Sequence, residues 1–276
     1  MSGPTLIPFP LLSLVLSSVY FRGWQKLRVH SGGSIPLWRS LCFPSGLLLI
    51  WVATCSSLAT LDHMLLTAHM VQHLLLMSVA PFLILWSRPK MALLCGLSAG
   101  FVCSVVGPLS RTWVVRYIAA LWGRPVFCWV VSVGVLVLWH VPFLFNAALQ
   151  FEPWHVIEHA SFLAGGFLFW SPVVPSHGVH ESRTWPLILY LFLATLPCDI
   201  LSGFLVFSDR VVYSVYLTHR YFSNWSVLDD QQCAGAVMWT CITILYLLPA
   251  TALTIRLLGS KQSSPDGVFD TEVSAP

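Results

Sequence analysis

The stretch LTAHMVQHLLLMSVAPFLILW, residues 66–86, is apolar for almost its whole length and is long enough to cross a lipid bilayer as one helix. It nevertheless carries two histidines four residues apart and a methionine after another four. On a helix this spacing places His69, His73 and Met77 on one face. Imidazole and thioether groups are both ligands for copper. Alternatively, the methionine fills space and the histidines form hydrogen bonds inside a helix bundle.

The composition of the whole chain indicates an integral membrane protein. Hydrophobic residues make up 57% of the 276 residues and charged residues only 9%, against about 25% charged residues in a typical soluble domain. The mean hydropathy of +0.77 agrees with this assignment. The formal net charge of +3 does not indicate nucleic-acid binding, because the basic residues lie in loops where a membrane protein needs them. None of the eight cysteines forms a C-x-x-C pair, and we interpret them as small buried apolar residues.

Helices are the expected elements, because lipid offers no hydrogen-bond partner to the backbone. We predict an all-α integral membrane protein, a bundle of seven transmembrane helices. The expected spans cover residues 5–21, 41–61, 66–86, 126–146, 154–174, 186–207 and 233–258. They form one domain, residues 1–258. The polar tail at 259–276 is rich in Pro, Gly and Ser, which predicts disorder. The predicted topology places this tail in the cytoplasm.

The distribution of basic residues predicts that the N-terminus lies outside and the C-terminus in the cytoplasm. With seven spans, 12 of the 14 Lys and Arg residues lie inside, and only Arg210 and Arg220 lie outside. An eighth span at residues 91–109 would change this ratio to 8 inside and 6 outside. We therefore expect residues 91–123 to lie along the inner membrane interface.

In this topology the histidines of three successive spans collect at the outer membrane surface. His140 lies near the outer end of the fourth span, while His155 and His159 begin the fifth with the same spacing as His69 and His73. Ionisable residues in or near the membrane are costly, which makes them functional candidates. Two facing pairs could hold one or two metal ions, or a haem. They could also cap helices or form hydrogen bonds across the bundle.

Four further polar residues are candidates for supporting such a site. Glu158 lies between the histidines of the second pair and could orient a ligand imidazole. Asp199 is the deepest acidic residue and needs a partner, either the histidines or a neighbouring helix. Asp230 and Gln231 stand where the last span enters the membrane from outside.

Copper suits these ligands better than zinc, because methionines lie near the histidines and no H-E-x-x-H motif is present. The sequence also contains no Walker loop, no G-x-G-x-x-G and no G-x-S-x-G motif. We therefore expect a protein that is not an enzyme.

Four motifs, taken in order, resemble the bacterial cytochrome c oxidase assembly factors of the CtaG type, which are associated with caa3-type oxidases. The motifs are AHMVQHLLLMSVAP (68–81), LWHVPFLFNAAL (138–149), HVIEHASFLAGGFLFWSPV (155–173) and LDDQQCAGAVMW (228–239). The resemblance implies a multi-pass protein of the bacterial inner or plasma membrane that is needed to make active oxidase and acts in copper delivery to subunit I. By this resemblance, the family's histidines fall on His69, His73, His140, His155 and His159, and its acidic-amide motif falls on Asp230, Gln231 and Gln232. Asp199 departs from the family pattern.

The expected function is therefore oxidase assembly, with copper held by, or delivered through, the outward-facing histidine cluster to the haem–copper centre of subunit I. The resemblance implies that the partners are subunit I, other copper chaperones and the lipid bilayer, with no nucleic acid. A purely structural scaffold is one alternative, and two others with a metal or haem function also stay open. One is a copper permease or copper-resistance protein, and the other is a membrane redox protein that binds haem.

Overall fold

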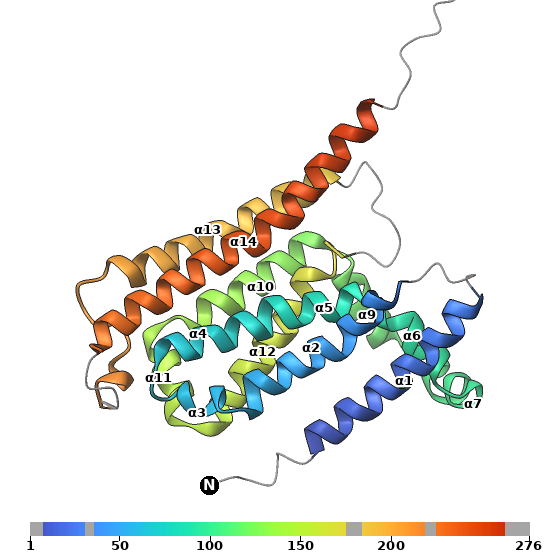
Figure 1. Cartoon of the computed structure of the whole chain (residues 1–276), viewed down its shortest axis with the longest axis horizontal. Coiled ribbons are helices and arrows are strands. Elements are labelled where there is room, and N and C mark those ends of the chain that lie inside the picture. The colour runs from blue at the N-terminus through green and yellow to red at the C-terminus, as the bar shows by residue number, and fades with distance from the viewer. Residues whose placement is uncertain (1–7, 31–35, 175–183, 219–224, 263–276) are drawn as a thin grey trace, which may run out of the picture.

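The computed structural model of the chain describes residues 8–30, 36–174, 184–218 and 225–262. All regular secondary structure within these ranges is helical, which confirms the all-α prediction (Figure 1). The elements are α1 (Pro8–His30), α2 (Leu37–Cys55), α3 (Leu58–Leu61), α4 (Leu66–Leu74), the π-helix η1 (Leu75–Val79), α5 (Ala80–Trp86), α6 (Pro89–Gly96), α7 (Ala99–Phe101), the π-helix η2 (Val102–Val106), α8 (Gly107–Arg111), α9 (Trp113–Trp122), α10 (Pro125–Trp139), α11 (Pro142–Gln150), α12 (Glu152–Trp170), α13 (Thr184–Phe207), the 3₁₀ helix η4 (Ser214–Thr218) and α14 (Val227–Gln262).

The stretch at residues 66–86 is the central helix of the fold. It consists of α4, η1 and α5 in direct succession, as the sequence predicts. Inside the protein, 67% of its apolar window is buried, against 17% to 39% for the three other helices of similar length and hydropathy. It packs against α14 through α4, against α12 through η1 and against α2 through α5 (Figure 1). Most of its histidine face is therefore enclosed by other helices.

A π-helical turn interrupts the central helix in its middle. Pro81 has no N–H to offer the carbonyl group of Met77, four residues earlier, and its ring would clash with that carbonyl in a regular helix. The N–H of Ala80 donates instead to the carbonyl of Leu75, five residues back. The distortion lies where α12 crosses, and α12 has a glycine, Gly166, at the contact.

Four helices are long and apolar enough to cross a membrane: Leu37–Leu61, Leu66–Trp86, Thr184–Phe207 and Val227–Gly259. Two bent helix pairs pass the same test if each is taken as one span. The first joins α6 to Ala99–Arg111 with a bend of 115°, and the second joins α9 to α10 with a bend of 84°. The described residues thus provide four to six candidate spans, and the predicted number of seven is not confirmed.

Several of the predicted helix boundaries differ from the structure. The segment at 126–146 is not one helix, because α10 ends at Trp139 and α11 begins at Pro142. The proline holds the preceding residue, Val141, in an extended conformation, which breaks the helix beside His140. In addition, α14 continues to Gln262, four residues into the region expected to be tail.

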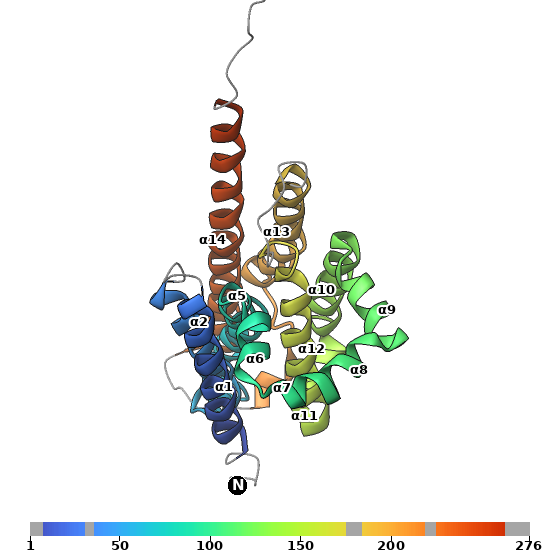
Figure 2. The same cartoon turned by 90° about the vertical axis from the view of Figure 1, so that its right-hand side faces the viewer.

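The segment at 91–123 contains several short helices instead of one long one. Its first helix, α6, packs against α1, and α7, η2, α8 and α9 lead from there to α10 (Figure 2). The contact between α1 and α6 is made at two glycines. A Cβ atom on Gly23 would lie 2.6 Å from the backbone nitrogen of Gly96, so the two backbones approach as closely as glycine allows. Nothing in these contacts tests the interfacial location predicted for residues 91–123.

Candidate metal centre

The first predicted histidine pair lies on the buried face of α4. His69 and His73 are one helical turn apart, and their ring centroids are 4.2 Å apart in an edge-to-face arrangement. His69 is fully buried, and only 5% of the surface of His73 is exposed. The ring centroid of Phe145 lies 4.9 Å from that of His69, and the ring centroid of Phe162 lies 4.0 Å from that of His73. The pair is therefore enclosed by apolar groups.

The second pair lies on α12 and faces the first. The ring centroids of His155 and His159 are 4.2 Å apart. Across the helix contact, the ring of His155 lies 5.7 Å from that of His69, and the ring of His159 lies 6.0 Å from that of His73. Two pairs that are 86 residues apart in the chain are thus brought into one cluster.

Glu158, on the same helix as the second pair, points at the first. Its Oε1 atom lies 3.6 Å from Nε2 of His69 and 3.5 Å from Nε2 of His73. The side chain is fully buried. These three residues form a group whose ligand atoms all lie within 4.8 Å of one another, close enough to bind one metal ion. The sequence suggested only a supporting role for Glu158, and this geometry makes it a candidate ligand.

A second group of the same kind includes Asp62, which the sequence analysis missed. Asp62 lies in the turn between α3 and α4, and its Oδ2 atom is 3.4 Å from Nε2 of His155. Asp62, His69 and His155 also have ligand atoms within 4.8 Å of one another. Burial raises the pKa of Asp62, and the nearby His63 and His69 partly oppose that rise. Its position in the sequence could have revealed it, since Asp62 and His63 lie just before the helix that carries the first pair.

The cluster contains many buried polar atoms without hydrogen-bond partners. The ring nitrogens of His69 and His73 have no hydrogen-bond partner. The two carboxylate oxygens of Glu158 have none either. Buried polar groups are normally hydrogen-bonded, because each unpaired one costs about 1–3 kcal/mol. Imidazole nitrogens and carboxylate oxygens are also metal ligands. This arrangement fits a metal-binding role better than a purely structural one.

His140 adjoins the cluster from the break between α10 and α11. Its ring centroid lies 6.3 Å from that of His73, and 5% of the residue is exposed. Its Nδ1 atom is 2.7 Å from the carbonyl oxygen of Leu136. A carbonyl only accepts hydrogen bonds, so Nδ1 carries the proton and Nε2 keeps a lone pair, which has no hydrogen-bond partner.

Met77 is buried one helical turn beyond His73, in the π-helix η1. It lines a small cavity together with His73 and His140. The structure therefore places the predicted methionine next to the histidine cluster, on the side that faces the middle of the bundle.

Asp230 caps the helix that carries the first histidine pair. Its Oδ2 atom accepts a hydrogen bond of 2.6 Å from the N–H of Leu66, and its Oδ1 atom accepts hydrogen bonds from the N–H and the hydroxyl of Thr67. These are N–H groups of the first turn of α4, which has no side-chain cap of its own. Asp230 thus fixes where α4 begins, one turn before His69.

Gln231 holds the loop that covers the cluster. Its side chain accepts a hydrogen bond from the N–H of Val212 and donates to the carbonyls of Leu205 and Arg210. Two buried tyrosines of this region, which the sequence analysis also missed, reach the site: Tyr213 donates to the carbonyl of His140 and Tyr216 to that of Asp62. Only three-dimensional contact reveals them, because their hydrogen bonds join residues 73 and 154 positions apart.

Asp199 is not part of the cluster in the described residues. It lies on α13 beside Cys198, no hydrogen bond or ion pair joins it to the described histidines, and one of its carboxylate oxygens is buried without a hydrogen-bond partner. Of the remaining histidines, His30 is exposed on α1 and contacts the carbonyl of Lys26, and His177, His180 and His219 lie outside the described residues.

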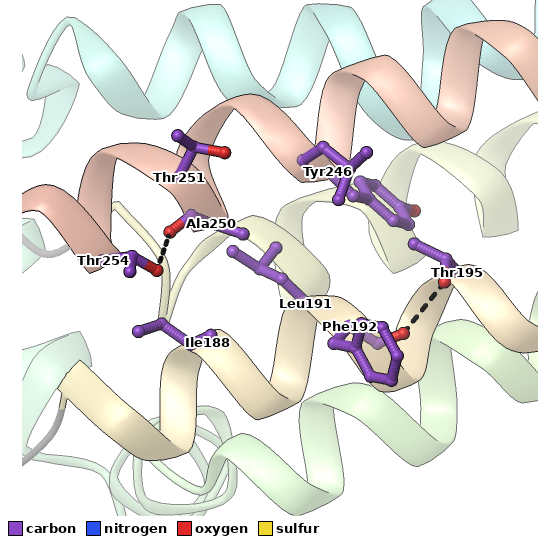
Figure 3. A pocket seen from close by; sticks show the side chains of 9 residues that line it. Ile188, Leu191, Phe192, Thr195, Tyr246, Ala250, Thr251 and Thr254 are labelled. Carbon is purple, nitrogen blue, oxygen red and sulfur yellow. Dashed lines mark hydrogen bonds between the residues drawn. The ribbon is translucent and has the colours of Figure 1, made fainter.

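A cavity of about 270 Å³ lies elsewhere, between α13 and α14. Figure 3 shows its lining of Ile188, Leu191, Phe192, Thr195, Tyr246, Ala250, Thr251 and Thr254. Two of its threonine hydroxyls, on Thr195 and Thr254, donate to the backbone of their own helix. The lining offers no histidine, cysteine or carboxylate, so this cavity is not a metal site.

The fold and the site thus define an all-helical protein with several candidate membrane spans and a buried cluster of histidines and carboxylates. A comparison with protein families matches residues 18–260 to the cytochrome c oxidase caa3 assembly factors (Caa3_CtaG). The chain belongs to this family, which confirms the resemblance noted in the sequence and assigns the protein to oxidase assembly. Searches of curated proteins and of solved structures find no significant match.

Proposed function

We propose that this protein binds copper at the histidine–carboxylate cluster and delivers it to the haem–copper centre of subunit I during oxidase assembly. The observation that carries the proposal is the pair of buried ligand groups, Asp62–His69–His155 and His69–His73–Glu158, in a chain of an oxidase assembly family. The role is one of binding and transfer, without catalysis. Imidazole with carboxylate is a ligand combination that binds divalent copper.

The chain's own residues supply the means of holding a cation. Glu158 and Asp62 bring negative charge, while the histidines bring neutral nitrogen donors with no competing hydrogen bonds at His69 and His73. Asp230 and the two loop tyrosines hold α4 and the surrounding turns in place. His63, with 49% of its side chain exposed and 3.7 Å from Asp62, lies at the edge of the cluster where cargo could enter or leave.

We further propose that the cluster faces the outer side of the bacterial plasma membrane, with seven spans, the N-terminus outside and the C-terminus in the cytoplasm. The excess of basic residues in the loops assigned to the inside supports this orientation. Reporter fusions after residue 150 should therefore indicate an outside location, and fusions after residue 180 an inside location. A reporter that places residues 111–124 outside would contradict the seven-span arrangement.

The functional test is the metal and haem content of oxidase purified from cells with and without this protein. Without it, we expect subunit I to be made and to contain its haems, but to lack copper at the haem–copper centre and to have lost oxygen reduction. Added copper should restore part of the activity, because mass action can replace a donor when the receiving site is intact. Oxidase with full copper but without haem would contradict copper delivery.

The geometry disfavours a haem site at the paired histidines. The Oε1 atom of Glu158 lies 3.6 Å from Nε2 of His69 and 3.5 Å from Nε2 of His73, so a carboxylate stands in front of the nitrogens that would have to bind a haem iron. A copper permease would need further ligands through the inner half of the bundle. The cavity in that half, between α13 and α14, has an apolar and threonine lining instead.

A further inference from the structure

A second, smaller cavity lies directly below the histidine cluster, toward the middle of the bundle. Its volume is about 20 Å³, which is enough for a single atom or one water molecule. The two histidines in its lining, His73 and His140, belong to the cluster above, and α4, η1, α10, α12, α13 and α14 all contribute to its wall.

Sulfur is concentrated around this cavity. Four of its twelve lining residues carry sulfur: Met70, Met77, Cys198 and Met238. The whole chain has only 6 methionines and 8 cysteines in 276 residues, so three of its six methionines meet at one place. Met70, His73 and Met77 follow one another at helical spacings of three and four, which puts them on one face of the central helix. Met238 comes from α14, across the bundle.

The cavity also contains a nitrogen donor whose lone pair is fixed in advance. The hydrogen bond from Nδ1 of His140 to the carbonyl of Leu136 leaves Nε2 unprotonated, buried and without a partner. Metal-binding histidines commonly have this second hydrogen bond, which sets the tautomer and the ring orientation.

We propose that this cavity is a second copper site, selective for Cu(I), with the thioethers of Met70, Met77 and Met238 and Nε2 of His140 as its ligands. Thioether and imidazole ligands select Cu(I), whereas the carboxylate-containing cluster above suits divalent copper. Because His73 belongs to both the cavity and the cluster, the two sites adjoin. The identity of the metal as cargo rests on the function proposed above, but the existence of the site can be tested separately.

The test uses the purified full-length protein labelled with selenomethionine and saturated with Cu(I) under reducing conditions. Selenium replaces sulfur only in methionine, so a selenium neighbour in the copper X-ray absorption spectrum identifies thioether ligands despite the eight cysteines. We expect this selenium signal in the unaltered protein and its loss in the Met70→Leu/Met77→Leu/Met238→Leu variant. Leucine is close to methionine in volume, so the bundle should tolerate the change.

The matched control is the Met64→Leu/Met91→Leu variant, which changes two methionines that do not line the cavity and should keep the selenium signal. A spectrum of the unaltered protein in which copper has only nitrogen and oxygen neighbours would overturn the proposal. This result does not depend on how well any variant folds. An unchanged signal in the triple variant would overturn it as well. Copper delivery is judged by oxidase composition, so a selenium signal with normally assembled oxidase in deletion cells would retain this site and reject the delivery role.

Discussion

Replacing Gly166 by alanine is expected to push α12 away from the central helix and to weaken both the fold and metal binding. A Cβ atom at this position would lie 2.7 Å from Cγ of Pro81 and closer still to the carbonyl oxygen of Met77. The proline ring and the backbone of the π-helical turn cannot easily move aside, so the whole helix has to shift. Overpacking of this kind costs about 1–3 kcal/mol. Since α12 carries His155, Glu158 and His159, the shift also separates the two halves of the cluster.

Gly165→Ala is the matched control. A Cβ atom there would meet its nearest neighbour, Cα of Ser132, at 3.8 Å, an ordinary contact. Both variants gain the same helix propensity, about 1 kcal/mol for alanine over glycine, so this gain cancels when the two are compared. Thermal unfolding in detergent and copper bound per folded molecule are the measurements. Equal unfolding temperatures for the two variants would show that the close approach of α12 at Gly166 does not support the fold.

The second large effect is expected from His69→Ala/His73→Ala, which removes ligands from both candidate groups. The affinity of the cluster for divalent copper should fall by more than about 100-fold, because loss of a residue that merely orients a ligand already costs 10–100-fold. The yield of folded protein should stay close to normal, because removing four buried ring nitrogens without hydrogen-bond partners offsets the packing lost with the two rings. In cells, the double variant should reproduce the deletion, with an oxidase that contains haem but lacks copper at the haem–copper centre.

The control for this experiment is His30→Ala, which removes an exposed histidine of α1 that forms a hydrogen bond with the backbone of its own helix. It should bind copper normally and support normal oxidase. A structural role of His69 and His73 predicts the reverse result: less folded protein, with an unchanged amount of copper in each folded molecule. A fully active oxidase in cells with the double variant would reject the copper-donor role of the cluster.

Local spacing made part of the site predictable from the sequence. His69, His73, His155 and His159 could be grouped because a repeat of four residues places side chains on one helix face, and because the predicted topology puts both pairs on one side of the membrane. Asp62 could not be predicted as part of the site, because it lies in a turn, where no periodicity indicates the direction of a side chain. Which lone pair of His140 stays free also depends on a hydrogen bond that only coordinates reveal.

The fold shows the same limit. The span at 66–86 follows from hydropathy and length, and it is confirmed as the central helix. Hydropathy could not indicate that Pro142 would break the predicted span at 126–146, because the residues on both sides are apolar. It also could not indicate that α6 packs against α1, since that contact depends on the absence of side chains at Gly23 and Gly96.

The contact between Asp230 and the start of α4 has an electrostatic consequence. The aligned peptide dipoles of a helix leave roughly half a positive charge at its N-terminus. In α4 this charge lies about one turn from His69, where it would repel a bound cation. The Asp230 carboxylate sits on the N–H groups that carry this charge and offsets it. A neutral hydrogen-bond acceptor could also cap the start of α4 at the same residue. Only an anion, however, offsets the positive charge of the helix N-terminus and so favours a cation beside His69 and His73.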